Sequence, residues 1–541
     1  MKPLLPACAL LLIANAPLAL GAAGDLDPTF GTSGIVLTDV TAGGDWAQNG
    51  VILPDGRIVA CGIQNSGAGF LLLRYQSNGS LDPSFGAGGK VQTAMPGSVD
   101  QTRIARQPDG KLVVAGSYFS SPNHFSVVAR YDSNGTLDPT FGTGGRVTQQ
   151  IGPIGDVQGL VIQSNGGIVI CGSFRVSGSI TYLGLRRYDA AGVLDTGFGV
   201  GGTVTRGPGT DNHGYALALQ PDGRIVAVGS TDLGGGLGPE MLTFRFKSNG
   251  SPDSTFATFG RAITSVSLFP EFAGAVALMP DGRVVVGGHI GIQSSNTHRY
   301  AALRFLPDGT LDPNFGSAGI TLTPEMGITT GYAFLTGMVL FSSGRMVLCG
   351  QATRLGSSDD FAMACLDSTG AMDASFGNGG QVYTDLAGGG RDIANGVLSE
   401  SDHKLVVLGS AGTGVLVGGP QVGVARYLFD ESVVGVAAES ARDVDFGLDG
   451  IFPNPFGSST RLSFRLPEEA RVRLAVYDVC GREVRVLEAG VLDPGSHVFG
   501  WDGRDAGGER LRAGVYLARL EWPGAAGRLR RASVRRLVLL P

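Results

Sequence analysis

The chain has 541 residues, and its 41 Lys and Arg against 47 Asp and Glu give a formal net charge of −6 at pH 7. A chain with this charge has no general attraction for nucleic acid or for an anionic membrane surface, so we predict neither as a partner. Glycine contributes 88 residues, while only 16% of the chain is charged and 43% is hydrophobic. This composition fits tight turns between short strands better than it fits disorder, and it favours an all-β protein.

The first 23 residues are typical of a secretory signal peptide. Lys2 precedes an apolar run from Leu4 to Leu20, and small residues follow at 21–23. No stop-transfer pattern comes after this run, so removal of residues 1–23 is favoured over a retained anchor, and no transmembrane segment is expected in the mature chain. The segment predicts export from the cytoplasm.

A motif of the form Leu-Asp-Pro-Thr-Phe recurs through residues 24–430 and is most complete at 137–141. Successive copies are 55 to 61 residues apart, a period typical of solenoids, propellers and arrays. The seven copies place an aspartate at Asp27, Asp82, Asp138, Asp195, Asp253, Asp312 and Asp373.

Each period holds four short segments with strand-like patterns and none with helical periodicity. In the second copy these segments are 90–93, 102–107, 111–116 and 125–131. A Pro-Asp-Gly turn at 108–110 joins the second segment to the third, because Pro presets φ, Asp bonds its own backbone and Gly accepts a positive φ. Four antiparallel strands repeated seven times predict a seven-bladed β-propeller over residues 24–430.

The recurring motifs resemble those of the delta-60 repeat family of bacterial secreted proteins. The resemblance covers residues 26–430 and rests on three elements that recur in register. These are the LDPTFG motif, the Pro-Asp-Gly turn followed by Lys or Arg and an apolar run, and an Arg followed by Tyr or Phe before a Gly turn. The resemblance implies propeller blades and an exported location, and it supplies no catalytic residues.

An arginine recurs on the fourth segment of six copies, shortly before the motif aspartate. These arginines are Arg74, Arg130, Arg187, Arg245, Arg304 and Arg426. We predict that each pairs with an Asp-Pro carboxylate and holds neighbouring blades together. The sixth copy has Cys365 in place of the arginine and keeps Asp373, which therefore needs another partner. One carboxylate per blade is too few for a Ca²⁺ site, so the aspartates are interpreted as structural and no metal is predicted.

The loops of the predicted propeller fall into two sets. Alternate loops of an up-and-down blade share a face, so the Pro-Asp-Gly turns and the Asp-Pro loops lie together on one face. The opposite face carries irregular loops, for example 95–101, 118–124, 206–215 and 231–240. Irregular loops on a rigid scaffold are where binding specificity is normally placed, although they are equally interpretable as spacers. A ligand site is expected on this face.

Residues 431–450 are predicted to be an acidic linker, after which the composition changes. Residues 451–541 alternate apolar and polar side chains, with Leu462, Phe464 and Leu466 on one face of a strand. About seven short strands here predict a β-sandwich. Four segments, at 452–456, 476–484, 501–505 and 513–517, resemble the FlgD-like Ig-like domain and the C-terminal sorting domains of type IX secretion. The resemblance implies sorting or anchoring through secretion or outer-membrane machinery. The expected location is therefore the extracellular space or the outer-membrane surface of a Gram-negative-type bacterium.

Motifs that suggest chemistry have simpler interpretations. Residues 197–202 satisfy G-x-G-x-x-G but lead into a strand, whereas a dinucleotide site needs a helix at that point. Residues 401–403 gather Ser, Asp and His but align with the hairpin turns of other copies. Cys61, Cys171 and Cys349 share one repeat position and are interpreted as small buried residues rather than disulfide or metal ligands. No catalytic residue and no cofactor are predicted.

We therefore predict a secreted or cell-surface propeller that acts as a non-catalytic binding or adhesion module. Its ligand is an unknown extracellular protein or carbohydrate, and residues 451–541 attach it to the cell. The alternative is a secreted hydrolase or lyase with its site on the irregular-loop face or at the mouth of the central channel. A carboxylate pair or a histidine cluster at that face favours the enzyme, and an aromatic or neutral polar surface favours binding.

Overall fold

The computed structural model divides into two compact units, Met1–Ala441 and Arg442–Pro541. It describes residues 22–540 except 42, 65–66, 176–177, 235–237, 268, 293–296, 327–332, 354–357, 401–403, 413–418, 430–447, 453–455, 457–458, 467–469, 479–481, 493–494 and 523–530. Nearly all of the predicted signal peptide, most of the predicted linker and the turn at 401–403 lie outside the described residues. In the part that is described, no helix is both long and apolar enough to cross a membrane.

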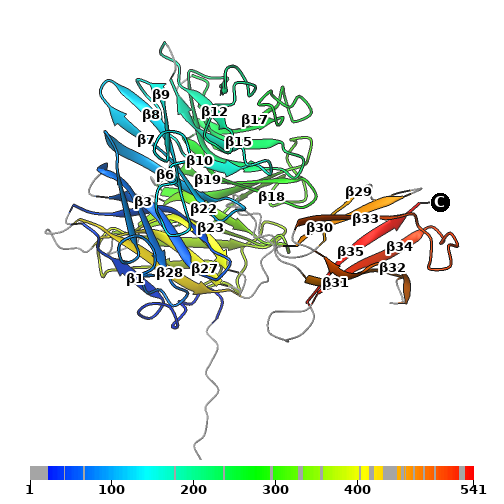
Figure 1. The fold of residues 1–541 in the computed structure, drawn as a ribbon. Helices are drawn as coiled ribbons and strands as arrows, with labels where there is room; N and C mark the ends of the chain where they lie inside the picture. Colours follow the sequence, from blue (N-terminus) through cyan, green and yellow to red (C-terminus); the bar gives the residue numbers. More distant parts are fainter. Residues whose placement is uncertain are drawn as a thin grey trace, which may run out of the picture. The chain divides into compact units, whose positions relative to one another are not determined.

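The first unit is all-β, and its described residues form seven four-stranded antiparallel sheets, the blades of a propeller (Figure 1). Blade 1 contains β2 (Trp46–Ile52), β3 (Ile58–Gln64), β4 (Gly69–Tyr75) and β5 (Lys90–Ala94). Blade 2 contains β6 (Ser98–Arg106), β7 (Leu112–Ser120), β8 (Asn123–Tyr131) and β9 (Arg146–Gly152). Blade 3 contains β10 (Gly159–Ile162), β11 (Ile168–Phe174), β12 (Tyr182–Tyr188) and β13 (Thr203–Arg206).

The other four blades repeat this order of strands. Blade 4 contains β14 (Asp211–Leu219), β15 (Ile225–Asp232), β16 (Glu240–Phe246) and β17 (Arg261–Thr264). Blade 5 contains β18 (Glu271–Leu278), β19 (Val284–Ile292), β20 (Thr297–Phe305) and β21 (Ile320–Leu322). Blade 6 contains β22 (Ala333–Leu340), β23 (Met346–Thr353), β24 (Asp359–Leu366) and β25 (Gln381–Thr384). Blade 7 contains β26 (Ile393–Glu400), β27 (Lys404–Ala411), β28 (Gln421–Leu428) and β1 (Ile35–Thr38).

Blade 7 joins the two ends of the propeller. Its outermost strand is β1, which pairs with β28 from Ile35 opposite Ala425 to Thr38 opposite Val422. The sequence repeat is therefore offset from the blade by one strand: the predicted second copy begins with β5 of blade 1 and continues with β6, β7 and β8 of blade 2. The seventh copy is divided between the two ends of the propeller. Its last strand, β28, ends at Leu428, whereas its Asp-Pro loop is the first one in the chain.

Burial follows the position of a strand in its blade. Every residue of β3 and β4 is buried, because both faces of the sheet pack against neighbouring blades. The outermost β5 is only half-buried. Innermost strands of successive blades, such as β2, β6 and β26, contact one another around the channel. This arrangement explains why the middle strands read as continuous apolar runs and the outer strands do not.

The two uniform loop types meet at one face of the propeller. The Pro-Asp-Gly turn joins β2 to β3 and the Asp-Pro loop joins β4 to β5, so both lie at the same end of the blade. Arg57 after the turn contacts Asp82 of the loop, with 2.8 Å between Nη1 and Oδ2. At the turn in blade 2, Gly110 has φ 88°, the left-handed conformation that glycine adopts most easily. Irregular loops occupy the opposite end.

The second unit is a β-sandwich. Its described strands form a three-stranded sheet of β29 (Leu448–Phe452), β30 (Thr460–Leu466) and β33 (Gly495–Trp501). A four-stranded sheet contains β32 (Glu483–Leu492), β31 (Ala470–Asp478), β34 (Gly514–Trp522) and β35 (Arg531–Leu539). Leu462 and Phe464 are buried in its core as the alternation predicts, together with Trp501, whose indole N–H donates to the carbonyl of Arg504 at 2.9 Å.

Candidate functional site

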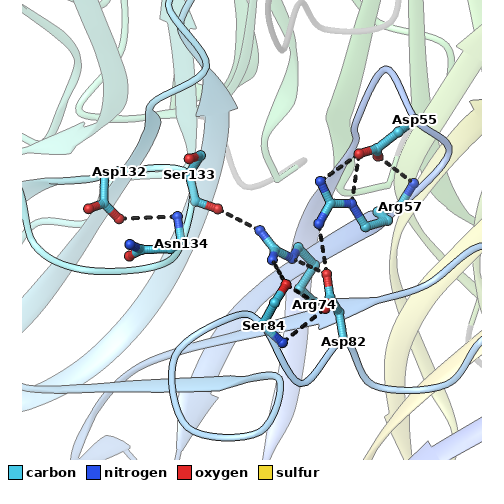
Figure 2. A network of polar contacts seen from close by, with 8 residues as sticks. All are labelled: Asp55, Arg57, Arg74, Asp82, Ser84, Asp132, Ser133 and Asn134. Atoms are coloured by element: carbon cyan, nitrogen blue, oxygen red, sulfur yellow. Dashed lines mark hydrogen bonds and ion pairs between the residues drawn. The ribbon is translucent and has the colours of Figure 1, made fainter.

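The six predicted arginines each contact the motif aspartate of their own repeat copy. In blade 1, Arg74 Nε lies 2.8 Å from Asp82 Oδ2 (Figure 2). The same guanidinium lies 4.5 Å from the centre of the Phe85 ring. The equivalent Nε–Oδ2 distances are 2.7 to 2.9 Å for Arg130–Asp138, Arg187–Asp195, Arg245–Asp253, Arg304–Asp312 and Arg426–Asp27. The Asp and the Phe of the motif therefore hold the same cation.

The same arginines reach into the next blade. Arg74 Nη1 donates a hydrogen bond of 2.5 Å to the carbonyl of Ser133, which follows β8 (Figure 2). The other acceptors, at 2.5 to 2.6 Å, are the carbonyls of Ala190 for Arg130, Ser248 for Arg187, Pro307 for Arg245, Ser368 for Arg304 and Ser77 for Arg426. The contact between blades is thus a hydrogen bond of the arginine itself, and the aspartate fixes its orientation.

A second cation, which the sequence analysis missed, joins five of these aspartates. It is the residue after the Pro-Asp-Gly turn or its equivalent: Arg57, Lys111, Arg224, Arg283 and Lys404, within 2.8 to 3.3 Å of Asp82, Asp138, Asp253, Asp312 and Asp27. Burial alone would raise the pKa of Asp27, but hydrogen bonds from Thr29 and the charges of Arg426 and Lys404 lower it to about 2. The sequence feature that could have revealed this second cation is the Lys or Arg that recurs directly after the turn.

The junction that lacks a motif arginine uses a different cation. Asp373, whose own copy has Cys365, is paired with Arg345 at 2.6 Å between Oδ2 and Nη2. Arg345 also lies 4.7 Å from the centre of the Phe429 ring. Asp373 is therefore paired with Arg345, the cation that follows the turn, and Phe429 provides the aromatic ring that packs against its guanidinium.

The three cysteines that share a repeat position lie in the core. Cys61, Cys171 and Cys349 are at most 1% exposed, and no disulfide joins them within the described residues. Burial raises the pKa of the Cys61 thiol to about 12, so it is neither a ready nucleophile nor a ready metal ligand. Cys480 lies outside the described residues.

A cavity of about 340 Å³ lies in the central channel, lined by residues on or beside the innermost strands and by His289 of β19. Each of these strands begins at the irregular-loop end of its blade. In six of them, β2, β6, β14, β18, β22 and β26, the pairing slips by one residue within the first five positions. The unpaired residues are Gln48, Asp100, Tyr215, Gly274, Thr336 and Asn395, and all of them except Asp100 line the cavity. A bulge redirects the side chain of its extra residue, and in five of these six strands that residue faces the cavity.

One half of the cavity is polar and comes from blades 7, 1, 2 and 3. It carries the amides of Gln48, Gln101, Gln158 and Asn395 and the guanidinium of Arg103. Several of these side chains bond the neighbouring blade. The amide nitrogen of Asn395 donates to the carbonyl of Ala47 at 2.8 Å, and that of Gln48 donates to the carbonyl of Asp100 at 3.1 Å.

The other half is aromatic and comes from blades 4, 5 and 6. The rings of Tyr215, Phe272, His289 and Phe334 line it. Phe272 stacks on His289 with 5.2 Å between centroids, and Phe334 meets His289 edge-on at 5.0 Å. These contacts fix the rings as a continuous wall across three blades.

Among the described residues lining the cavity, Arg103 is the one that carries a charge at neutral pH. Burial lowers the pKa of His289 to about 3, so its ring is neutral. The backbone N–H of Leu335 donates to its Nδ1 at 3.3 Å, which places the ring proton on Nε2. Burial raises the pKa of Tyr215 to about 12, so the phenol stays protonated. The described residues of the lining are net positive and include no carboxylate.

A separate acidic cluster lies on the irregular-loop face. Ligand oxygens of Asp360, Asp385 and Asp392 lie within 4.8 Å of one another, a geometry compatible with a metal ion although three oxygens fall short of a Ca²⁺ shell. Burial raises the pKa of Asp392 to about 6. Its carboxylate accepts backbone N–H bonds from Leu386 at 2.6 Å and Gly412 at 3.0 Å.

Asp392 shares this loop-binding role with equivalent residues of other blades. Each stands three residues before the bulge of its innermost strand. Asp45 accepts backbone N–H bonds from Val40 and Thr41, and Glu271 accepts one from Val266 at 2.8 Å. The repeated position indicates that these buried carboxylates fix the loop that leads into each innermost strand.

The fold and the cavity together define a seven-bladed β-propeller protein that carries an Ig-like sandwich as its second unit. Six segments match the family described as Domain of unknown function (DUF5122) beta-propeller, at 53–85, 107–141, 163–198, 220–256, 280–315 and 342–376. Residues 453–522 match the FlgD Ig-like domain. These matches confirm the predicted propeller repeats and the predicted FlgD-like domain. The copy without a match is the one divided between the two ends of the propeller.

Solved structures of several classes resemble the chain distantly. PorZ, a surface component of the type-IX secretion system of Porphyromonas gingivalis, is 13% identical, with 90% of this chain and 68% of that chain covered and a TM-score of 0.28. A fungal alcohol oxidase in complex with copper is 13% identical, with 96% and 100% covered and a TM-score of 0.37. Virginiamycin B lyase of Staphylococcus aureus is 9% identical, with 73% and 99% covered and a TM-score of 0.37. No curated protein matches the sequence, and scores this low carry no argument about function.

Proposed function

We propose that this protein is an exported, non-catalytic binding module whose ligand enters the central channel and whose second unit attaches it to secretion or outer-membrane machinery. The observation that supports binding is the lining of the channel cavity, where aromatic rings face neutral amides and one guanidinium. Concave sites with apolar walls and a few convergent polar groups are the usual form of small-ligand sites.

The chemistry of the lining favours binding over catalysis. General acid–base catalysis needs a group whose pKa lies near the working pH. His289 has a pKa of about 3 and Tyr215 one of about 12, so neither exchanges a proton readily at neutral pH. The cavity also lacks the paired carboxylates that glycoside hydrolysis commonly uses. Its groups are suited to holding a ligand.

A binding and turnover assay tests this role. The purified full-length chain is incubated with a panel of extracellular polysaccharides and peptides, and both retention and product release are measured. We expect at least one ligand to be retained without any bond being cleaved, and Phe272→Ala to reduce that retention. Product release at a rate proportional to protein concentration would overturn the proposal.

Export and attachment rest on the signal-peptide pattern of residues 1–23 and on the FlgD Ig-like match of residues 453–522. The test is fractionation of the source bacterium, with mass spectrometry of the mature C-terminus, against a chain lacking residues 451–541. Retention of the truncated chain inside the cell is expected. Unaltered export of the truncated chain would make the second unit an ordinary Ig-like module.

The second candidate function is a hydrolase or lyase on the irregular-loop face. It is favoured by the Asp360, Asp385 and Asp392 cluster, because a carboxyl with a pKa of about 6 suits a general acid. In this case product release in the assay above would fall at least a hundredfold in Asp392→Asn. Asp45→Asn is the matched control, because Asp45 holds the equivalent loop of blade 1 with no such cluster around it among the described residues.

A further inference from the structure

Resting on the proposed function, we infer that the ligand of the channel cavity is a small ring-bearing carboxylate, with an acidic sugar residue as the best fit. Three features point to this chemistry: one guanidinium on the polar side, neutral amides beside it, and an aromatic wall opposite. An acidic sugar residue offers a carboxylate, hydroxyls and an apolar ring face in the same order. The source is either a free sugar acid or the end of an acidic polysaccharide.

Arg103 is the anion-binding group of the cavity. Its Nη1 donates to the carbonyl of Thr102 at 2.8 Å and its Nη2 to the amide oxygen of Gln158 at 3.4 Å. A guanidinium has five N–H donors, so these bonds set its plane and leave donors for a ligand in the cavity it lines. Planar pairs of N–H groups match the two oxygens of a carboxylate.

The carboxylate whose charge acts on this arginine, that of Asp156, is already engaged. Asp156 accepts from the amide of Gln158 at 3.0 Å and from the backbone N–H of Ser173 at 2.7 Å. It therefore orients Gln158, which in turn bonds Arg103, and it is not among the residues lining the cavity. Burial lowers the pKa of Arg103, but an arginine remains protonated at neutral pH. An entering carboxylate would meet an oriented and only partly compensated positive charge.

The amides beside Arg103 suit the hydroxyls of a sugar. Gln101 lines the cavity, and no other described residue bonds its side chain, so it offers both donors and an acceptor. Asn395 uses its nitrogen on the carbonyl of Ala47 and keeps its oxygen as an acceptor. Gln48 is held at both ends, by the carbonyl of Asp100 and by the hydroxyl of Thr102. A mixture of fixed and free amides orients a polar ligand at little entropic cost.

The aromatic wall suits the apolar face of the same ring. Tyr215, Phe272 and Phe334 come from three successive blades and are linked by ring contacts, such as the one of 6.4 Å between Tyr215 and Phe272. Neutral His289 adds a further flat surface without a competing charge. The cavity volume of about 340 Å³ falls within the range of small-molecule sites, so it has room for a ring and not for a folded domain.

Isothermal titration of the full-length chain tests the inference. The probes are glucuronic acid, its methyl ester, glucose, benzoate and polygalacturonic acid. We expect glucuronic acid to bind at least tenfold more tightly than its uncharged methyl ester or glucose, and benzoate to bind more weakly than glucuronic acid. Tighter binding of polygalacturonic acid than of free sugar acids would identify a polysaccharide end as the source.

Variants of β6 separate charge from shape. Arg103→Gln should weaken glucuronic acid at least tenfold and change glucose less than twofold, whereas Arg103→Lys should retain part of the preference. Arg106→Gln is the matched control, because Arg106 lies on the same strand and outside the cavity lining. Circular dichroism and the melting temperature verify that each variant is folded.

The outcomes distinguish this inference from the proposed function. Equal binding of glucuronic acid and its methyl ester to the unmodified chain overturns the carboxylate, and this measurement needs no variant. Binding of glucose alone leaves a binding module with a neutral ligand, so the ligand class fails while the proposed function stands. Failure of all five probes overturns the inference as well, whereas turnover of any panel polysaccharide overturns the proposed function.

Discussion

Five of the six motif arginines, all but Arg187, are buried, with at most 6% of their surface exposed. Removing a guanidinium from water costs several kcal/mol unless its charge and its donors are matched. The repeat provides this match in one compact unit: a carboxylate on Nε, a carbonyl of the next blade on Nη1 and a phenylalanine ring against the plane. The motif therefore provides the contacts that allow an arginine to be buried at a blade junction.

Asp138→Asn should lower the free energy of unfolding by about 3 kcal/mol, the cost of leaving a buried cation without its anion. Asn keeps the Oδ1 that accepts from the backbone and hydroxyl of Thr140, but it places an NH₂ group against Arg130 Nε and Lys111. Asp195→Asn is the control, since that carboxylate is 35% exposed and a loss of about 1 kcal/mol is expected. Urea denaturation measures both, and equal losses would contradict the argument.

The pH dependence of the same pair gives a second readout. Hydrogen bonds from Thr140, together with Lys111 and Arg130, hold the pKa of Asp138 well below its usual range. A carboxyl with a depressed native pKa stabilises the fold above its unfolded pKa and loses that contribution as the pH falls toward the native value. The difference between the parent chain and Asp138→Asn should therefore be full above about pH 5 and shrink below about pH 4. If the difference in unfolding free energy between the two chains does not change with pH, the charge of Asp138 does not cause the stabilisation.

The sequence predicted the arginine–aspartate pairing because both residues recur at fixed positions. It did not predict the second cation, since Lys111 and its equivalents follow a turn and their reach across to the next loop depends on how the blade folds back. Asp45, Glu271 and Asp392 escaped notice for a related reason. They differ in type and spacing, and only the strand register places them at one position.

At the scale of the element, the loop after each motif is shaped by glycines in two different situations. Gly142 and Gly144 both have positive φ, 53° and 59°. A Cβ on Gly142 would lie 2.5 Å from Val147 and closer still to the carbonyl of Arg146, whereas a Cβ on Gly144 would meet nothing within 4 Å. Gly144 is therefore required only by its backbone conformation, whereas Gly142 is required both by its conformation and by close packing.

Gly144→Ala should cost about 1 kcal/mol, the penalty of a left-handed conformation for a residue with a Cβ. Gly142→Ala should cost about 3 kcal/mol or more, because the same penalty is joined by a clash with backbone that cannot move aside cheaply. Thermal and urea unfolding of the two variants measure the difference. If both variants lose the same free energy, the close approach has no energetic weight.

The channel site illustrates what strand patterns leave out. The sequence predicted strands such as 102–107 and 111–116 well, because their apolar runs reflect burial between blades. The bulges at Gln48, Tyr215 and Asn395 were not predicted, because one extra residue in a short strand does not change its pattern of apolar and polar residues recognisably. These residues also lie far apart in the chain and share no residue type. Only closure of the ring brings them to one cavity.

At the scale of the whole molecule, the ring is closed by the β1–β28 pair and by the contacts of Arg426 with the first Asp-Pro loop. This blade alone is built from both ends of the propeller. In the other blades, the motif arginine contacts the loop that follows the third strand of the next blade. In blade 7 this loop is interrupted, because the chain leaves the propeller after β28. Cys365 and the Arg345–Phe429 contact occupy that place. The irregular sixth copy is thus explained by its position beside the closure.

Covalent closure should therefore stabilise the propeller more than an ordinary cross-link inside a blade. Val36 and Val424 are directly opposite in the β1–β28 register, and directly opposite residues of antiparallel strands have Cα atoms about 4.5 to 5.5 Å apart, within disulfide range. The oxidised double variant Val36→Cys and Val424→Cys should gain about 4 kcal/mol, because the bond closes almost the whole propeller chain. The melting temperature with and without reductant measures the gain, and each single variant corrects for the lost valine. If the bond forms, as verified by mass, yet the melting temperature does not rise, covalent closure of the ring does not stabilise the propeller.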